Sequence, residues 1–360
     1  MKRRLGIAIA FLALAGCGEE VGQVQDFALP MAVSNNAVTL ALGPQGPTAY
    51  SFMGLGPGKT PADITRAAFA CVLAARRCQA IAAVPVPQGR LAATAVTVGE
   101  TILIFGGYGI AADGRETSMP EVLAFDPKTT RYSRRAPMPT PVDDSLAAVY
   151  ADRYVYLVSG WHDTDNVALV QVYDASEDRW FAATDYPGTP VFGHAGGIVE
   201  NWLVSADGVA LGKAEGEQEA RRFAMVSEAW IGEIDPQDPR HIRWQAIEPH
   251  PGAPLYRAAA KASAHRQQVI FAGGSETPYN YDGIGYDGTP AAPSARVLAF
   301  DIRHGAWLRL ADKPAATMDH RGLVEAHDHF WTLGGMESGQ RVTAAVHGFA
   351  AQDPPTAVAP

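Results

Sequence analysis

The stretch Ile104-Phe105-Gly106-Gly107 closes an apolar run with a doubled glycine, and two aromatic landmarks follow it at fixed spacing. In this copy the first landmark is Phe125-Asp126, and Tyr132 comes six residues after the aspartate. A pattern that returns with a period of about 50 residues predicts a repeat architecture, in which the repeated residues are framework. The two other clear copies are Val158-Ser159-Gly160, Tyr173-Asp174 and Trp180, and Phe271-Ala272-Gly273-Gly274, Phe300-Asp301 and Trp307.

Each repeat is predicted to contain four short strands. In the best-marked copy the first strand covers 91–98, the second 101–105 and the third 121–125, and Asp126-Pro127 opens the turn to the fourth. Alternation and β-branched residues favour strand over helix. Six such repeats indicate an all-β fold, a six-bladed propeller. The blades start near Asn35, Arg90, Asp144, His194, Arg257 and Arg321.

The last repeat lacks its fourth strand. After Arg341–Phe349 no strand with a tryptophan follows, whereas Phe27–Pro30 copies the strand ending seen at Trp307–Pro314. We therefore expect residues 23–30 to complete the sixth blade, which closes the ring and removes an exposed sheet edge.

The first 17 residues look like an export signal. A basic start at residues 2–4 precedes an apolar run, Leu5–Leu14, that is too short to span a bilayer. The run leads into Leu-Ala-Gly-Cys at 14–17, which resembles a bacterial lipobox. That resemblance implies a lipidated Cys17 and an exported lipoprotein on the periplasmic face of the outer membrane. An ordinary secretory signal cut nearby is the alternative.

The repeats resemble bacterial kelch propellers, and the resemblance covers residues 24–352. It implies one propeller domain, preceded by a tether at 18–23 and followed by a disordered C-terminal tail at 353–360. The Gly-Gly and Asp-x5-Trp spacing is specific to this architecture and not to a function.

Composition and charge restrict the partners. The 360-residue chain is 47% hydrophobic, enough for a sizeable core, and has a formal net charge of −9. An acidic chain without a basic stripe argues against nucleic acid, and it leaves the lipid as the only tie to a membrane. The ten histidines show no metal-ligand spacing, so we expect no metal and no cofactor. A pore metal held by His162, His194 and His320 is the geometric alternative.

Cys71 and Cys78 are seven residues apart, which is the spacing of the facing aromatic pairs in other blades. Residues directly opposite in a hairpin lie near the distance that a disulfide needs, and an exported protein meets an oxidising compartment. We predict a Cys71–Cys78 disulfide; two buried thiols are the alternative.

The loops that enter the first strands and leave the second strands of a propeller meet at its central funnel. Three arginines at equivalent positions, Arg90, Arg257 and Arg321, could clamp a carboxylate, and Trp161 could stack on a sugar ring. Mutual pairing of charges in a wet pore is the alternative. The other candidate ligand contacts of the funnel are Asp144, His162, His194 and His320.

The fifth blade carries a long insertion, Glu276–Gly288, with three tyrosines among Gly, Asn and Asp. A tyrosine joins an apolar ring to a hydroxyl, which suits carbohydrate, and long loops in compact domains are usually functional. We expect this loop to cover the site and Tyr281 to contact the ligand; a solvated decoration is the alternative.

Among kelch families the chain most resembles the exported N-acetylneuraminate epimerase (sialic acid mutarotase) group. The resemblance rests on Gly54-Leu55-Gly56, on Arg90 and Arg321 at the starts of blades, and on 270–274 with the insertion behind it. It implies interconversion of the anomers of a carboxylated sugar, which needs an acid–base pair and an anion clamp.

The catalytic match is broken at one position. The group's glutamate follows the glycine that ends the second strand of blade four, but here Gly208 is followed by Val209, which cannot transfer a proton. Arg222 is the candidate for the group's partner arginine, and Glu276 or Glu337 for a replacement base. We therefore favour binding of a small, acidic carbohydrate without robust catalysis. The alternatives are a mutarotase-like enzyme and a protein-interaction scaffold at the outer membrane.

Overall fold

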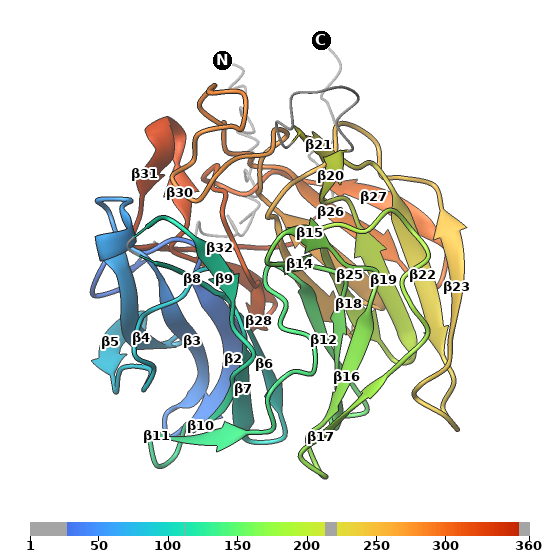
Figure 1. Ribbon diagram of the computed structural model, residues 1–360, viewed down its shortest axis with the longest axis horizontal. Coiled ribbons are helices and arrows are strands. Elements are labelled where there is room, and N and C mark those ends of the chain that lie inside the picture. Colours follow the sequence, from blue (N-terminus) through green and yellow to red (C-terminus); the bar gives the residue numbers. More distant parts are fainter. Residues whose placement is uncertain (1–26, 112, 213–221, 353–360) are drawn as a thin grey trace, which may run out of the picture.

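The computed structural model describes residues 27–111, 113–212 and 222–352, and these form a ring of six four-stranded antiparallel sheets. The ring is a six-bladed β-propeller, as the repeats predict (Figure 1). The first strands of successive blades contact one another around the centre, so the loops before these strands meet near the central axis.

The strands of the blades have the following bounds. Blade 1 has β2 (Ala37–Gly43), β3 (Gly46–Leu55), β4 (Ile64–Val72) and β5 (Arg77–Ile81). Blade 2 has β6 (Thr94–Val98), β7 (Thr101–Phe105), β10 (Val122–Asp126) and β11 (Arg131–Arg135). Blade 3 has β12 (Leu146–Tyr150), β13 (Tyr154–Val158), β16 (Val170–Asp174) and β17 (Arg179–Ala182). Blade 4 has β18 (Ala195–Val199), β19 (Trp202–Ala206), β22 (Ala229–Ile234) and β23 (Ile242–Ile247). Blade 5 has β24 (Ala259–Ser263), β25 (Gln268–Ala272), β26 (Val297–Asp301) and β27 (Ala306–Leu310). Blade 6 has β28 (Val324–Ala326), β29 (His329–Leu333), β32 (Ala345–Phe349) and β1 (Phe27–Ala28).

The ring is closed by β1, which pairs with β32 in the sixth blade. Phe27 lies opposite Val346 and Ala28 opposite Ala345. The ring of Phe27 also packs edge-on against Trp331, with the ring centroids 5.8 Å apart. The predicted closure by the N-terminal strand is thereby confirmed.

The repeated aspartate is a turn residue. Asp126 accepts hydrogen bonds from Lys128 N (2.8 Å) and Thr129 Oγ1 (2.7 Å), which closes the turn between β10 and β11. The side-chain bond from Thr129 is the main reason why the pKa of Asp126 lies below its usual value. Its role is local, because an aspartate that bonds the backbone two residues on stabilises a turn.

The core lies between neighbouring blades. Phe125 and Tyr132 face each other in blade 2 with ring centroids 4.8 Å apart, and Phe125 packs on Phe52 of blade 1 at 5.5 Å. Tyr173 and Trp180 repeat the arrangement in blade 3. Each such aromatic pair contributes about 0.5–1.5 kcal/mol beyond its buried area, so the repeated aromatics hold the blades together.

Blade 1 replaces this aromatic pair with a disulfide. Cys71 on β4 lies directly opposite Cys78 on β5, and the two form a disulfide with their Cα atoms 4.0 Å apart. The predicted bond is present, at the position that the spacing of the aromatic pairs indicates.

Four two-stranded ribbons add to the ring between the second and third strands of blades 2, 3, 4 and 6. Their strands have only two to four residues, too few to be predicted from the sequence pattern. With the fifth-blade insertion, drawn in orange in Figure 1, they build up the upper side of the molecule. The ribbons are β8 (Tyr108–Ile110) with β9 (Glu116–Ser118), β14 (Trp161–His162) with β15 (Asp165–Asn166), β20 (Val209–Gly212) with β21 (Arg222–Met225), and β30 (Met336–Glu337) with β31 (Arg341–Val342).

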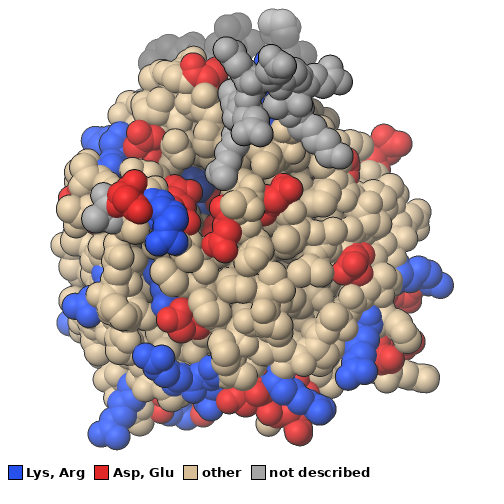
Figure 2. Space-filling view, in the orientation of Figure 1, with Lys and Arg blue, Asp and Glu red and all other residues tan. Residues whose placement is uncertain are grey.

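The segments predicted as signal, tether and tail, at 1–17, 18–23 and 353–360, lie outside the described residues. Within the described ranges the helical elements are two short turns, η1 (Pro61–Asp63) and η2 (Ser338–Gln340), and neither has the length or the apolar character of a membrane span. On the face drawn in Figure 2, acidic and basic side chains of the described residues are interspersed without a continuous basic stripe.

Candidate functional site

A ring of six residues, one before the first strand of each blade, surrounds the central axis. All six have left-handed backbone, with φ from 53° to 67°. Asp144 N donates to Ala92 O (3.1 Å) and Gly193 N to Asp144 O (2.8 Å), so hydrogen bonds run from blade to blade. Left-handed backbone costs a residue other than glycine about 1 kcal/mol, and the bonds between blades offset this cost. We call these residues the collar: Asn35, Ala92, Asp144, Gly193, Arg257 and Asp319.

The charged collar side chains pair with one another. Arg257 donates from Nε and Nη2 to Asp144 Oδ2 (3.0 and 2.7 Å) and from Nη1 to Asp319 Oδ1 (3.1 Å). Arg321 pairs with Asp144 Oδ1 at 2.7 Å and donates to Asn35 Oδ1 at 3.2 Å. Two guanidinium groups thus balance two buried carboxylates. This arrangement is the mutual pairing given above as the alternative to a ligand clamp.

Burial lowers the pKa of Arg257, but the negative charges around it outweigh burial and raise its pKa well above the usual value. Asp144 is the foremost of these charges, and Asp319 adds to it. Arg257 therefore stays charged, and its charge is balanced by the carboxylates of Asp144 and Asp319.

Each collar residue directly follows a residue that forms a β-bridge. The partner in the bridge lies at the end of the second strand of the same blade or shortly after it. These pairs, here called the floor pairs, form the floor of the funnel, and most of their side chains belong to one buried apolar cluster. The residue that precedes the collar residue is apolar in four blades, whereas blade 3 has Asp143 and blade 1 has Ser34 at this position. The floor pairs are Ser34–Leu55, Leu91–Tyr108, Asp143–Trp161, Phe192–Val209, Tyr256–Ser275 and Met318–Met336.

A cavity of about 260 Å³, the upper cavity, lies over the collar between the floor pairs, the ribbons and the insertion. Its size suits a small ligand, because ligand sites are usually a few hundred Å³. Asp144 and Arg257 of the collar contribute to it from below. The residues that line it are Tyr108, Glu116, Asp143, Asp144, Trp161, Phe192, Phe223, Arg257, Asn280 and Tyr286.

Asp143 is the buried acid of the upper cavity. Asp143 is 3% exposed, and its Oδ2 accepts a hydrogen bond of 2.6 Å from Ser118 Oγ on β9. Among the described residues none donates a hydrogen bond to its Oδ1. Burial raises the pKa of Asp143 well above its usual value, and the nearby charges of Asp144 and Glu116 raise it further.

Aromatic rings form a continuous wall of the upper cavity. The rings of Trp161 and Phe192 are 5.5 Å apart, and that of Phe223 lies 5.8 Å from Trp161. Tyr286, from the insertion, stacks on Phe223 at 4.0 Å. Such a wall offers an apolar face beside the polar groups of the collar.

The insertion crosses the upper side of the ring. Lys59 Nζ of blade 1 donates to Asp282 O (3.0 Å), and Gln340 Nε2 of blade 6 donates to Ala291 O (2.8 Å). The loop is therefore held by the two blades that follow blade 5 around the ring, and it supplies Asn280 and Tyr286 to the cavity lining. Tyr281, the predicted contact, packs instead against the apolar cluster of the floor pairs.

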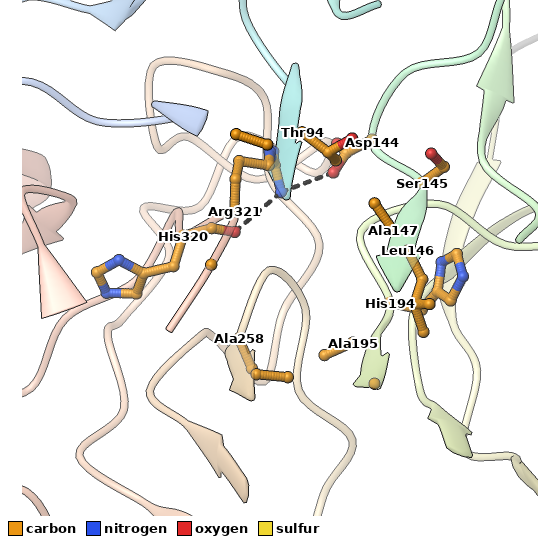
Figure 3. Close-up of a pocket in the computed structure, with 14 residues that line it drawn as sticks. Thr94, Asp144, Ser145, Leu146, Ala147, His194, Ala195, Ala258, His320 and Arg321 are labelled. Atoms are coloured by element: carbon orange, nitrogen blue, oxygen red, sulfur yellow. Dashed lines mark hydrogen bonds and ion pairs between the residues drawn. The ribbon is translucent and has the colours of Figure 1, made fainter. Parts of the chain in front are cut away.

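A smaller cavity of about 60 Å³ lies below the collar (Figure 3). Arg321 joins Asp144 to the backbone of His320 there, and His194 lies across the cavity from His320. Burial lowers the pKa of His194 to about 4 and that of His320 well below its usual value, so both are neutral. The space suits a few waters. In the described ranges no group of three or more His, Cys, Asp or Glu is placed to hold a metal ion.

Two predicted contacts lie apart from the upper cavity. Arg90 donates to Gly106 O (3.1 Å) and pairs with Glu121 at 2.9 Å. The Nδ1 of His162 hydrogen-bonds Pro141 O at 2.7 Å. Both side chains therefore serve local structure.

The three candidates for catalysis also lie outside the cavity lining. Glu276 faces Arg296 at 3.6 Å with 55% of its side chain exposed, and Glu337 pairs with Arg341. Arg222 is exposed at the start of β21. Val209, in the place of the expected glutamate, is fully buried in the apolar cluster.

Other residues of the cavity were not predicted as site residues. Asp143 and Phe192 lie just before two of the predicted blade starts. A comparison of equivalent positions in the six blades could therefore have identified them as site residues. Glu116 and Phe223 come from the ribbons, whose strands are too short to leave a sequence signal.

The comparisons with known proteins identify the architecture. No family model matches the sequence. Kelch-like protein 15 of Gallus gallus is 27% identical over 146 residues, which cover 37% of this chain and 30% of that protein. Kelch-like protein terF of Aspergillus terreus is 23% identical over 274 residues, 74% of this chain and 54% of that protein. This chain thus spans only part of these relatives.

A solved propeller extends the likeness over nearly the whole chain. The structure named "Structure of YjhT" superposes with a TM-score of 0.68 at 16% identity, covering 89% of this chain and 99% of that one. At this identity the likeness concerns the fold. The likeness supports the six-bladed propeller fold, and parts of the sequence are similar to kelch-like proteins.

Proposed function

We propose that the protein binds a small carbohydrate in the upper cavity. The observation that carries this proposal is the lining itself, in which Trp161 and Phe192 form an aromatic wall and Asp143 and Asn280 provide polar groups. A sugar has apolar ring faces and hydroxyl-bearing edges, so an aromatic wall beside convergent polar groups complements it.

The charges of the lining favour a sugar without a carboxylate. Arg257 is the cation among the described residues that line the upper cavity, and both Asp144 and Asp319 already neutralise it. An acidic sugar would bring another negative charge toward Asp143 and Glu116. The acidic ligand expected from the sequence is therefore less favoured than a neutral or basic one.

Saturation-transfer NMR with a panel of neutral, amino and acidic monosaccharides tests the proposal. We expect transfer to at least one sugar, and an affinity about tenfold lower in Trp161→Ala, since interface aromatics of this kind contribute more than 1 kcal/mol. Trp202→Ala, at the far end of β19, is the matched control and should bind normally. If no sugar binds, a protein-interaction role becomes the better explanation.

Anomer interconversion is a second candidate function, and Asp143 favours it. A general acid needs a pKa above that of an ordinary carboxyl, and burial gives Asp143 such a pKa inside the cavity. Exchange NMR on the anomers of a bound sugar would show faster interconversion with the protein present. The acceleration should vanish in Asp143→Asn and persist in Glu276→Gln and Glu337→Gln, whose side chains lie outside the cavity.

We also propose that the protein is exported and anchored through Cys17. The support is the sequence alone, because the Leu-Ala-Gly-Cys motif lies outside the described residues. Metabolic labelling with palmitate should mark the wild-type protein and leave Cys17→Ser unlabelled. Equal labelling of both would contradict the anchor.

A further inference from the structure

We propose that the upper cavity takes a sugar that carries a free ammonium group, and that this group sits beside Asp143 against the aromatic wall. The ligand class would be amino sugars with an unmodified amine. This inference rests on the proposed carbohydrate binding and adds the chemical group that decides specificity.

The first support is the unused oxygen of Asp143. Ser118 occupies Oδ2, but no described residue donates to Oδ1, although Asp143 is more than nine-tenths buried and lines the cavity. An ammonium group has three donors, and one of them could complete the hydrogen bonding of this carboxylate.

The second support is the set of aromatic rings around the same space. Trp161, Phe192, Phe223 and Tyr286 line the cavity together with Asp143. Ring faces attract cations because of their electron distribution, and tryptophan does so best. The same chemistry already operates next to the cavity, where the Arg257 guanidinium lies 4.7 Å from the ring centre of Tyr256.

The third support is the charge balance. Arg257 and Arg321 are matched by Asp144 and Asp319, so these four residues are together neutral. Asp143 lines the same space and is not part of this balance. In its ionised form it favours a cation over a neutral group and opposes an anion.

The blade register shows that the other blades do not carry an acid at this position. At the equivalent floor position, blades 2, 4, 5 and 6 have Leu91, Phe192, Tyr256 and Met318. An apolar residue would fit the propeller framework there, and a buried acid is unfavourable in it. A carboxyl group at this one position is consistent with selection for a ligand.

The proposed contact has a defined pH dependence. Burial raises the pKa of Asp143 in the free protein, which favours its protonated form. An ammonium group beside it favours the carboxylate, so binding releases a proton and the affinity rises with pH. The charges that face Asp143 are Asp144, Glu116 and Arg321, and they stay in place on binding.

Isothermal titration calorimetry of the full chain with D-glucosamine, D-glucose, N-acetyl-D-glucosamine and D-glucuronate tests the proposal. We expect D-glucosamine to bind at least about tenfold more tightly than D-glucose, as one buried cation contact would give. The affinity for D-glucosamine should rise with pH as long as its amine is largely charged, up to about pH 7. In buffers of different ionisation enthalpy, the measured heats should reveal proton release.

Asp143→Asn should abolish the preference for D-glucosamine over D-glucose, and it should abolish the pH dependence of D-glucosamine binding. Asp328→Asn, at an exposed aspartate, is the matched control and should keep both. Phe223→Leu is a second variant, on a ribbon. It should weaken the binding of D-glucosamine without changing Asp143.

The outcomes separate the two proposals. Equal binding of D-glucosamine and D-glucose, or a preference that survives Asp143→Asn, would overturn the ammonium site while carbohydrate binding stands. Binding of tetramethylammonium without binding of any sugar would overturn the carbohydrate and, with it, the amino-sugar assignment. No binding of any of these probes would contradict both.

Discussion

Arg257 shows how one side chain can be both framework and site. Its backbone takes the left-handed conformation that the collar requires, its guanidinium joins Asp144 to Asp319, and it forms part of the floor of the upper cavity. The charge of Arg257 is matched by Asp144 and Asp319, so an acidic ligand would compete with these two carboxylates. Asp143, next to Asp144 in the chain, is a further acid of the cavity lining.

Arg257→Met should destabilise the protein by about 3–5 kcal/mol, since it leaves two buried carboxylates short of one cation. Urea unfolding followed by tryptophan fluorescence would measure the loss. The control is Arg243→Met, whose wild-type side chain is 81% exposed and pairs with Glu233, and it should cost less than about 1 kcal/mol. Equal effects of the two substitutions would argue against an essential collar pair.

His194 should make the protein acid-sensitive. Its folded pKa of about 4 lies below the unfolded value of about 6.5, so the unfolded chain binds a proton that the folded one excludes. The stability is therefore present above about pH 6.5 and falls as the pH drops toward 4, by at most about 1.4 kcal/mol per pH unit.

Urea unfolding at about pH 7 and about pH 4.5 checks this expectation. His194→Gln should reduce the loss between the two pH values, leaving the share that comes from His320, whose pKa is also lowered by burial. His327→Gln, at an exposed histidine, should leave the loss unchanged. A pH profile that is the same in His194→Gln and wild type would refute the assignment.

At the scale of elements, the outer hairpin has the same structural role in each blade, but the chemical type of its facing residue pair differs between blades. Blades 2, 3 and 5 use facing aromatic residues, such as Phe300 and Trp307, whose rings are 5.1 Å apart. Blade 1 uses the Cys71–Cys78 disulfide at the same place. The register of the hairpin decides which residues face each other, and the chemistry of the pair is free to vary.

Replacing both Cys71 and Cys78 with alanine should lower the free energy of unfolding by about 2 kcal/mol, because the bond closes only a short loop. Thermal unfolding of the variant and of the wild type, each with and without a reductant, provides the measurement. The reductant should shift the wild type toward the variant and leave the variant unchanged. A variant as stable as the oxidised wild type would show that the bond contributes nothing.

The ribbons and the path of the insertion over the ring could not be predicted from the sequence. Most strands of the blades have five or more residues in alternation, which gives a readable pattern. The ribbon strands have two to four residues, and their pairing depends on turns between blades. The chain positions of Glu116 and Phe223 could therefore not be assigned to the cavity in advance.

At the scale of the whole molecule, closure of the ring joins the two ends of the described chain. β1 supplies the outer strand of the sheet formed by β32, β29 and β28, so an early segment completes the last blade. Without it, β32 would expose an unpaired edge, which tends to pair with other chains.

A protein that lacks residues 1–30 should therefore unfold at a lower temperature and self-associate. Light scattering coupled to gel filtration, together with thermal unfolding, would detect both changes. Removal of residues 353–360, which takes away none of the strands described above, is the control. A monomeric truncated protein with an unchanged melting temperature would mean that closure adds little.

The sequence by itself determined the number of blades, their strand order, the closing strand and the disulfide. These features depend on short-range spacing that repeats, and each copy is read from residues close together in the chain. Only the tertiary structure decided the site. The partners of Arg257 come from blades 3 and 6, and the lining of the upper cavity comes from four blades. Which charges cancel, and which acid is left facing the cavity, depends on contacts between residues far apart in the chain, and no local pattern records them.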